Sequence, residues 1–193
     1  MKQAFLAIGM IAFAATANAA DMGACTFDND ADQMIAACTE VIASDQATPK
    51  DLVDAYLYRC QAYDRKGEPN LGLADCLQSR RLDESNTSVH NSLSILYQNL
   101  GRFEEGVASA QQAVSLAPDD ATARNTLSNA TCRAGLVDLS VESRLEAMRL
   151  GRFDAGGLQT ALKNRGYYSG PVDGKFGSGS QAALRAWTQA GCP

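Results

Sequence analysis

The chain has 193 residues, of which 46% are hydrophobic, so it is long enough to bury a core in one or two domains. Its formal net charge of −5 argues against a nucleic-acid-binding or anionic-membrane-binding surface. A single histidine and the absence of a C-x-x-C pair argue against a metal site, and no cofactor is expected.

The first residues have the pattern of a secretory signal peptide. Lys2 supplies a positive start, Ala4–Ala15 is an apolar run, and Ala17–Ala19 is a small-residue cleavage box. The alternative is a buried N-terminal helix, which these flanking residues disfavour. The apolar run is too short to span a bilayer, and no later run is long enough. We therefore expect a signal peptide over residues 1–19 and an exported, periplasmic protein with no membrane span.

Residues 20–52 are expected to form an N-terminal capping segment. Within it, residues 31–44 predict a helix, because their apolar side chains fall on one stripe: Met34, Ile35, Cys38, Val41 and Ile42. A further helix is predicted to begin after Thr48. Thr48 suits the N-cap, Pro49 the first helical position, and Asp51 the third.

The central part of the chain is periodic. Gly67, Gly101 and Gly135 stand about 34 residues apart, and Tyr63 and Tyr97 repeat at the same interval. A glycine suits the left-handed end of a helix because it has no Cβ. The pattern resembles the tetratricopeptide repeat, a helix–turn–helix unit of about 34 residues. The resemblance implies an all-α fold, a solenoid of helix hairpins in which stacked units bury a common core.

Three repeats are expected over residues 53–154, at Val53–Asn86, Thr87–Asp120 and about 121–154. The third is degenerate, because Thr131 replaces the tyrosine and Ser140 replaces a small core residue. Terminal repeats often diverge where one face meets another part of the chain. In this chain, the C-terminal segment is expected to pack against that face of the third repeat.

Residues 155–193 are glycine-rich and carry three ordered blocks: Leu158-Gln159-x-x-Leu162, Gly166 through Gly177, and Ser180-x-x-Ala183-x-x-x-Trp187. They resemble the small helical peptidoglycan-binding domain found attached to cell-wall hydrolases. That domain normally continues into another helix, which does not follow before Pro193. We therefore expect a truncated module, with the helix around residues 138–150 supplying the missing packing.

Within this module the glycines at 170, 174 and 177 are expected to form turns, and Asp173 to cap the following helix. A small core is expected from Leu158, Leu162, Val172, Phe176, Ala183 and Trp187. The expected peptidoglycan-binding residues are Tyr167 and Tyr168, since aromatic faces suit sugar rings. The alternative is that either tyrosine belongs to the core.

The repeat family also implies a partner-binding groove on its concave face. The expected groove residues are Gln61, Asn91, Gln98, Asn125 and Asn129, an amide-rich strip suited to hydrogen-bonding an extended peptide. The lysine and arginine clamp that some members use for a terminal carboxylate is absent, because Leu57 and Thr122 occupy its lysine positions. The alternative is a solvated face with no ligand.

No catalytic constellation is found. His90 falls at an aromatic position of the second repeat, so it is expected to pack in the core. Glu104 and Glu105 are adjacent on a helix and point about 100° apart, so they do not form a facing pair. Oxidised cysteines cannot act as nucleophiles. A wall enzyme is therefore disfavoured.

Six cysteines in an exported chain imply disulfides. Cys60 and Cys76 flank the turn of one helix pair, and Cys25 precedes the helix that carries Cys38. The expected pairs are Cys25–Cys38, Cys60–Cys76 and Cys132–Cys192. The last would fasten the module to the solenoid and restrict the groove at its C-terminal end. The alternative leaves Cys132 and Cys192 free or bridging two molecules.

The sequence therefore predicts an exported, non-catalytic adaptor. It would bind peptidoglycan through its C-terminal module and a protein or peptide partner through its repeats. The alternative is a structural protein whose module only caps the solenoid.

Overall fold

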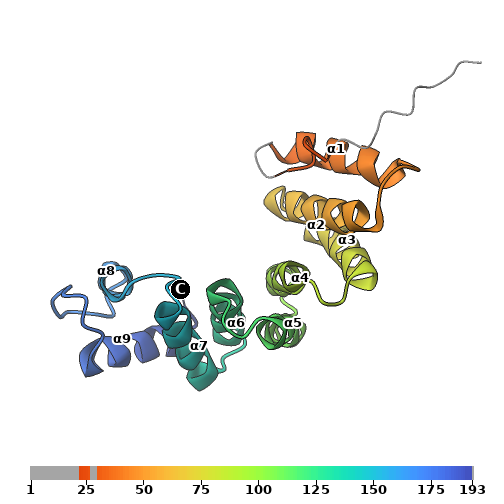
Figure 1. The fold of residues 1–193 in the computed structure, drawn as a ribbon. Coiled ribbons are helices and arrows are strands. Elements are labelled where there is room, and N and C mark those ends of the chain that lie inside the picture. The colour runs from red at the N-terminus through yellow and green to blue at the C-terminus, as the bar shows by residue number, and fades with distance from the viewer. Residues whose placement is uncertain (1–21, 27–29, 193) are drawn as a thin grey trace, which may run out of the picture.

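The structure is a computed structural model that describes residues 22–26 and 30–192. The predicted signal peptide lies outside these residues. The described chain contains helices and no strand (Figure 1). The helices are α1 (Ala31–Ala43), α2 (Pro49–Arg65), α3 (Pro69–Leu82), α4 (Thr87–Asn99), α5 (Phe103–Leu116), α6 (Ala121–Arg133), α7 (Val137–Arg149), α8 (Ala155–Asn164) and α9 (Ser178–Gln189). The predicted all-α fold class is confirmed.

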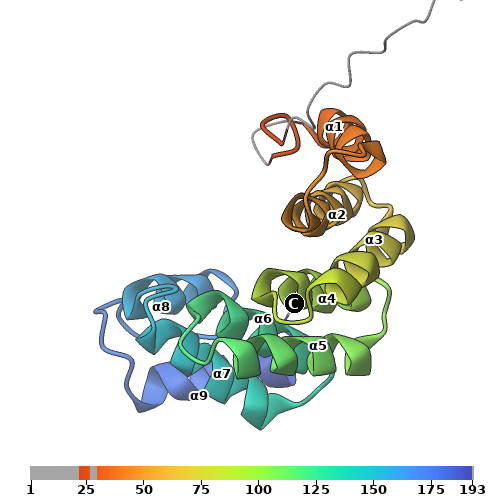
Figure 2. The ribbon, with the colours of Figure 1, turned by 45° about the vertical axis from the view of Figure 1, so that its right-hand side comes forward.

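Three helix hairpins follow one another along the chain, α2–α3, α4–α5 and α6–α7 (Figures 1 and 2). Successive hairpins pack through α3 against α4 and through α5 against α6. The first helices of the hairpins also contact one another, α2 with α4 and α4 with α6. The first helices therefore form one continuous face of the solenoid, which is where the groove was expected.

The repeating glycines end the first helix of each hairpin. Gly67, Gly101 and Gly135 have φ angles of 75°, 72° and 74°, a left-handed conformation that side chains with a Cβ rarely adopt. In each turn the next amide donates back to the helix; that of Arg102, for example, donates to the carbonyl of Tyr97 at 2.8 Å. These bonds satisfy the last helical carbonyls. The sequence period therefore reflects a repeated backbone requirement.

The predicted helix start at Thr48 is present as a reciprocal capping box. The amide of Asp51 donates to the Thr48 hydroxyl at 3.1 Å, and the amide of Thr48 donates to the Asp51 carboxylate at 2.9 Å. Asp120 begins α6 similarly, because its carboxylate accepts from the amides of Thr122 and Ala123. These caps separate one hairpin from the next.

The degenerate third repeat has a polar seam between its two helices. The hydroxyls of Ser128 and Ser140 each donate to the other residue's carbonyl at 2.9 Å. The buried Thr131 hydroxyl donates to the carbonyl of Leu127 at 2.6 Å. Hydrogen bonds thus satisfy the buried hydroxyls of Ser128, Ser140 and Thr131.

The N-terminal helix α1 packs on the outer side of the first hairpin, against α2. Met34, Cys38 and Val41 of α1 form one buried cluster with Ala55 and Ala62 of α2. In this position α1 covers apolar surface of α2.

The C-terminal helices α8 and α9 share a core with α7. Val141 of α7 is buried together with Leu158 and Leu162 of α8 and with Ala183 and Leu184 of α9. The expectation that the last repeat helix completes the module's packing therefore agrees with the structure. The helix α7 belongs to both the solenoid and the module.

Two expectations for the module are wrong. Val172 is 46% exposed, so it is not part of the core. Asp173 does not cap α9, whose N-cap is Gly177 without a side-chain hydrogen bond. The carboxylate of Asp173 instead accepts from the side chain of Gln159 and from the amide of Lys175. The loop therefore folds back on α8 before α9 begins.

The described residues contain three disulfides, Cys25–Cys38, Cys60–Cys76 and Cys132–Cys192, with Cα separations of 4.8, 5.4 and 6.3 Å. None of the described helices combines the length and the apolar character needed to cross a membrane.

Candidate functional site

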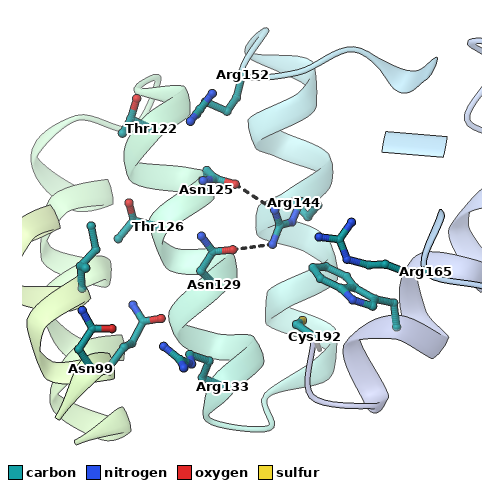
Figure 3. A pocket seen from close by; sticks show the side chains of 13 residues that line it. Asn99, Thr122, Asn125, Thr126, Asn129, Arg133, Arg144, Arg152, Arg165 and Cys192 are labelled. Carbon is teal, nitrogen blue, oxygen red and sulfur yellow. Dashed lines mark hydrogen bonds between the residues drawn. The ribbon is translucent and has the colours of Figure 1, made fainter. Parts of the chain in front are cut away.

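A recess of about 600 Å³ lies on the face formed by α4 and α6, and α7 and the C-terminal module close it on one side (Figure 3). Residues from α4, α6, α7, the turn after α7, α8–α9 and the C-terminal tail line it: Ile95, Gln98, Asn99, Thr122, Asn125, Thr126, Asn129, Arg133, Arg144, Arg152, Arg165, Trp187 and Cys192. Its size falls within the range of pockets that hold ligands, roughly 300–1,000 Å³.

The recess brings together three of the five expected groove residues, Gln98, Asn125 and Asn129. Gln61 lines a second recess of about 220 Å³ beside it, and Ile95 lines both. Asn91 lines neither, and its side-chain oxygen is buried without a hydrogen-bond partner in the described structure. The amide-rich strip is therefore continuous from α2 to α6 except at Asn91.

Arg144 organises the wall of the recess. It extends from α7 toward α6, where its two terminal nitrogens donate to the side-chain oxygens of Asn125 at 3.0 Å and Asn129 at 2.6 Å (Figure 3). The aromatic rings of Phe153 and Trp187 lie 5.8 and 5.3 Å from its guanidinium carbon. These rings and amides hold the guanidinium of Arg144 in place. Only 9% of Arg144 is exposed.

Burial has a clear electrostatic effect on Arg144. Desolvation and the nearby positive charge of Arg165 lower the pKa of Arg144 to about 10. At neutral pH the guanidinium remains protonated, so a positive charge is retained in a largely dehydrated position. Its Nε atom is buried and has no hydrogen-bond partner in the described structure.

Three further arginines line the same recess. Arg133 ends α6, Arg152 lies in the turn between α7 and α8, and Arg165 caps the end of α8. Figure 3 shows Arg152 and Arg133 toward the two ends of the recess, with Arg144 between them. This arginine cluster is not among the predicted site residues. The available signal was Arg144 itself, a charged residue at helical spacing between Val141 and Ala147 on the buried stripe of α7.

The two tyrosines expected to bind peptidoglycan lie at a different recess, of about 530 Å³, between the loop before α9 and α9 itself. Its walls are formed by Tyr167, Tyr168, Ser169, Gly170, Pro171, Gly179, Ala182, Ala183 and Ala186, none of which lines the arginine-containing recess. Both tyrosines are half-buried against the module core. The Tyr168 hydroxyl donates to the carbonyl of Pro171 at 3.0 Å, which fixes this ring over the loop.

His90 and the cysteines, which were considered as possible catalytic residues, have structural roles. His90 is buried, and its Nε2 atom lies 2.9 Å from the carbonyl of Glu84. The six cysteines are paired in the three disulfides. Within residues 22–26 and 30–192, no three His, Cys, Asp or Glu side chains cluster as a metal site would require.

Comparison with solved structures defines the class of fold. The Thermus thermophilus tetratricopeptide protein TTC0263 has a TM-score of 0.56 at 20% identity, over 70% of each chain. MamA has a TM-score of 0.57 at 16% identity, over 84% of this chain and 86% of its own. YrrB, described as a tetratricopeptide protein with an unusual peptide-binding site, has 0.57 at 15% identity, over 84% and 80%. The chain therefore has the fold of a tetratricopeptide-repeat solenoid.

The C-terminal part is similar to a second family. Residues 155–190 match the sequence model of the family described as "Putative peptidoglycan binding domain". This range covers α8, the loop with the two tyrosines, and α9. The protein thus combines a tetratricopeptide solenoid with a segment of the peptidoglycan-binding type. No curated protein sequence matches the chain.

Proposed function

We propose that the protein is a non-catalytic periplasmic adaptor that binds peptidoglycan through residues 155–193 and a protein or peptide partner through its repeats. The observation that carries the proposal is the match of residues 155–190 to a peptidoglycan-binding family, on a chain whose remaining helices form a tetratricopeptide solenoid. Both are kinds of domain that bind rather than catalyse. Three disulfides suit an oxidising compartment outside the cytoplasm.

Recesses on different parts of the chain support two separate ligands. The tyrosine recess lies within the module, and the two amide-rich recesses lie on the first helices of the repeats, the larger one being closed on one side by the module. We assign wall binding to Tyr167 and Tyr168, and partner binding to Gln61, Gln98, Asn125 and Asn129. Asn91 is left out of the assignment because it lines neither repeat recess.

One experiment with two readouts tests this proposal. The full-length protein is sedimented with purified sacculi, and it is cross-linked to its partner in cells that make it. Tyr167→Ala is expected to weaken sedimentation about fivefold, since one aromatic stack contributes on the order of 1 kcal/mol. Tyr56→Ala, which changes a half-buried tyrosine on α2, is the matched control and is expected to sediment as the unaltered protein does.

Ile95→Lys is expected to abolish the cross-linked partner while leaving sedimentation unchanged, because Ile95 is 44% exposed between the two repeat recesses. The control is Leu71→Lys, at a residue on α3 that is 51% exposed and lines neither recess. A full-length protein that does not sediment with sacculi would contradict the proposal of wall binding.

The alternative is a structural role for the module, and one observation favours it. The module shares its core with α7 through Val141, so it covers the end of the solenoid whether or not it binds a ligand. An absence of both sedimentation and a cross-linked partner would favour this alternative.

A further inference from the structure

The recess between α6, α7 and the module concentrates positive charge that the chain itself does not neutralise. Four arginines line it, and none of its thirteen described lining residues is acidic. Elsewhere in the described chain, some arginines form an ion pair with a carboxylate, namely Arg59, Arg102, Arg149 and Arg185, and others do not. Among the described residues, no ion pair is found for any of the four recess arginines. The recess is therefore positively charged, although the protein as a whole has a net charge of −5.

The buried member of this group, Arg144, lacks what a buried cation normally has. A buried charge is costly unless it is paired and hydrogen-bonded. Arg144 has two neutral amide oxygens and two aromatic rings as neighbours, but its Nε atom has no hydrogen-bond partner among the described residues. Arg165 adds repulsion from the module side. An anion placed among these guanidinium groups would relieve the repulsion.

The rest of the lining suits a peptide better than a free ion. Side-chain amides and hydroxyls offer both donors and acceptors to a polypeptide backbone: Gln98, Asn99, Thr122, Asn125, Thr126 and Asn129. Ile95 connects this recess with the second one toward α2, so an extended segment can follow the first helices across both. Four arginines line the recess next to the module, whereas the second recess is lined by one arginine, Arg65, and by the acidic Asp64.

From this arrangement we propose that the recess binds the carboxylates of an acidic, extended peptide segment of a protein partner. The carboxylates would lie between Arg144 and Arg165, and the rest of the segment would run along α6 and α4 toward α2. Guanidinium groups match carboxylates with two parallel hydrogen bonds. The inference rests on the proposed partner-binding role of the repeats and specifies the chemistry of that partner. The wall polymer is disfavoured as the occupant, because the tyrosine recess shares no lining residue with this one.

The test uses the full chain with its disulfides intact and a simple probe, an acetylated and amidated tetraglutamate peptide. The tetraglutamine peptide is its uncharged match. Trp187 is the only tryptophan of the chain and lines the recess, so its fluorescence reports binding. Titration calorimetry detects binding that leaves the fluorescence unchanged.

Tetraglutamate is expected to bind saturably and more weakly as salt is added, and tetraglutamine is not expected to bind. Arg144→Gln and Arg165→Gln are each expected to weaken tetraglutamate binding about tenfold or more, because each removes a charge from the carboxylate site. Arg149→Gln is the matched control on the same helix. Its guanidinium is 2.7 Å from Glu146 and lies outside the recess, so binding should not change.

Should Arg144→Gln fail to fold, Arg133→Gln and Arg165→Gln carry the test, since both side chains are exposed. Equal binding of the two peptides, no saturable binding, or equal affinity in Arg165→Gln would overturn the proposal. A disaccharide–tetrapeptide from peptidoglycan that binds more tightly with the same arginine dependence would overturn it in favour of the wall. If sacculus sedimentation and Ile95-dependent cross-linking persist without tetraglutamate binding, the proposed function stands and only this inference fails.

Discussion

Gln159 shows how a single side chain shapes the module. It is fully buried, and its side-chain oxygen accepts from the amides of Asp173 and Gly174 at 3.1 and 2.9 Å. Its nitrogen lies 3.0 Å from both the Asp173 carboxylate and the Ser180 hydroxyl. One amide on α8 thereby fixes both the loop that carries the tyrosines and the start of α9. The loop adopts its shape because Gln159 accepts from the amides of Asp173 and Gly174 and donates to the carbonyl of Lys175.

We predict that Gln159→Leu lowers the free energy of unfolding by about 2–3 kcal/mol, because leucine leaves several buried polar groups unpaired. Denaturant unfolding followed by Trp187 fluorescence measures this. The control is Gln181→Leu, an exposed glutamine on α9, for which a change within about 0.5 kcal/mol is expected. Equal stability of Gln159→Leu and the unaltered protein would show that the loop does not depend on this network.

At the scale of elements, the repeats depend on a small residue where the second helix of each hairpin crosses the first. Gly72, Gly106 and Ser140 occupy this place in α3, α5 and α7. A Cβ added at Gly72 would lie 2.7 Å from the carbonyl oxygen of Cys60, whereas at Gly106 the nearest atoms are 3.3 Å away. The first hairpin is therefore packed more tightly than the second.

This difference predicts opposite outcomes for the same substitution. Gly72→Ala should destabilise the protein by about 1–3 kcal/mol, because the backbone of α2 must move to admit the methyl group. Gly106→Ala should be close to neutral, since a tolerable contact is offset by a gain in helix propensity of about 1 kcal/mol. Thermal or denaturant unfolding of the two variants compares them directly. A larger loss at Gly106 than at Gly72 would contradict the packing argument.

The sequence predicted the elements well where the backbone itself imposes a residue type. Gly67, Gly101 and Gly135 repeat because each left-handed turn favours glycine, and Thr48 begins a helix because its hydroxyl accepts from the first-turn amide of Asp51. The expectation failed for Asp173, which resembled an N-cap by its position. The three-dimensional loop gives its carboxylate to Gln159 instead, and no local pattern shows this.

At the scale of the whole molecule, the arginine recess could not be predicted from the sequence. Arg133, Arg144, Arg152 and Arg165 come from different helices and one turn, and their convergence depends on how the module folds back on α7. The three expected groove residues in the recess were predictable because they lie on the repeating first helices. The residues on the opposite side of the recess belong to α7 and to the module, where the 34-residue repeat is no longer followed.

The module and the solenoid are joined in two ways, by the core around Val141 and by the disulfide between Cys132 of α6 and Cys192 after α9. This disulfide closes a loop with a sequence separation of 60 residues, which includes α7, α8 and α9. Cys192 also lines the arginine recess. The same bond that holds the end of the chain therefore forms part of the candidate site.

We predict that replacing Cys132 and Cys192 together by alanine lowers the free energy of unfolding by about 4 kcal/mol, as the loss of loop-closure restriction implies. In the folded state Trp187 should become more accessible to a neutral fluorescence quencher such as acrylamide, because α9 loses its attachment to α6. The control replaces Cys60 and Cys76, which close a shorter loop of separation 16 within the first hairpin. It should lose about 3 kcal/mol of stability but leave Trp187 quenching unchanged.

Peptide mapping without reductant tests the pairing itself: free thiols at Cys132 and Cys192, or a bridge between two molecules, would contradict it. Quenching that is unaltered in the Cys132–Cys192 double variant would show that the core around Val141 alone holds the module in place.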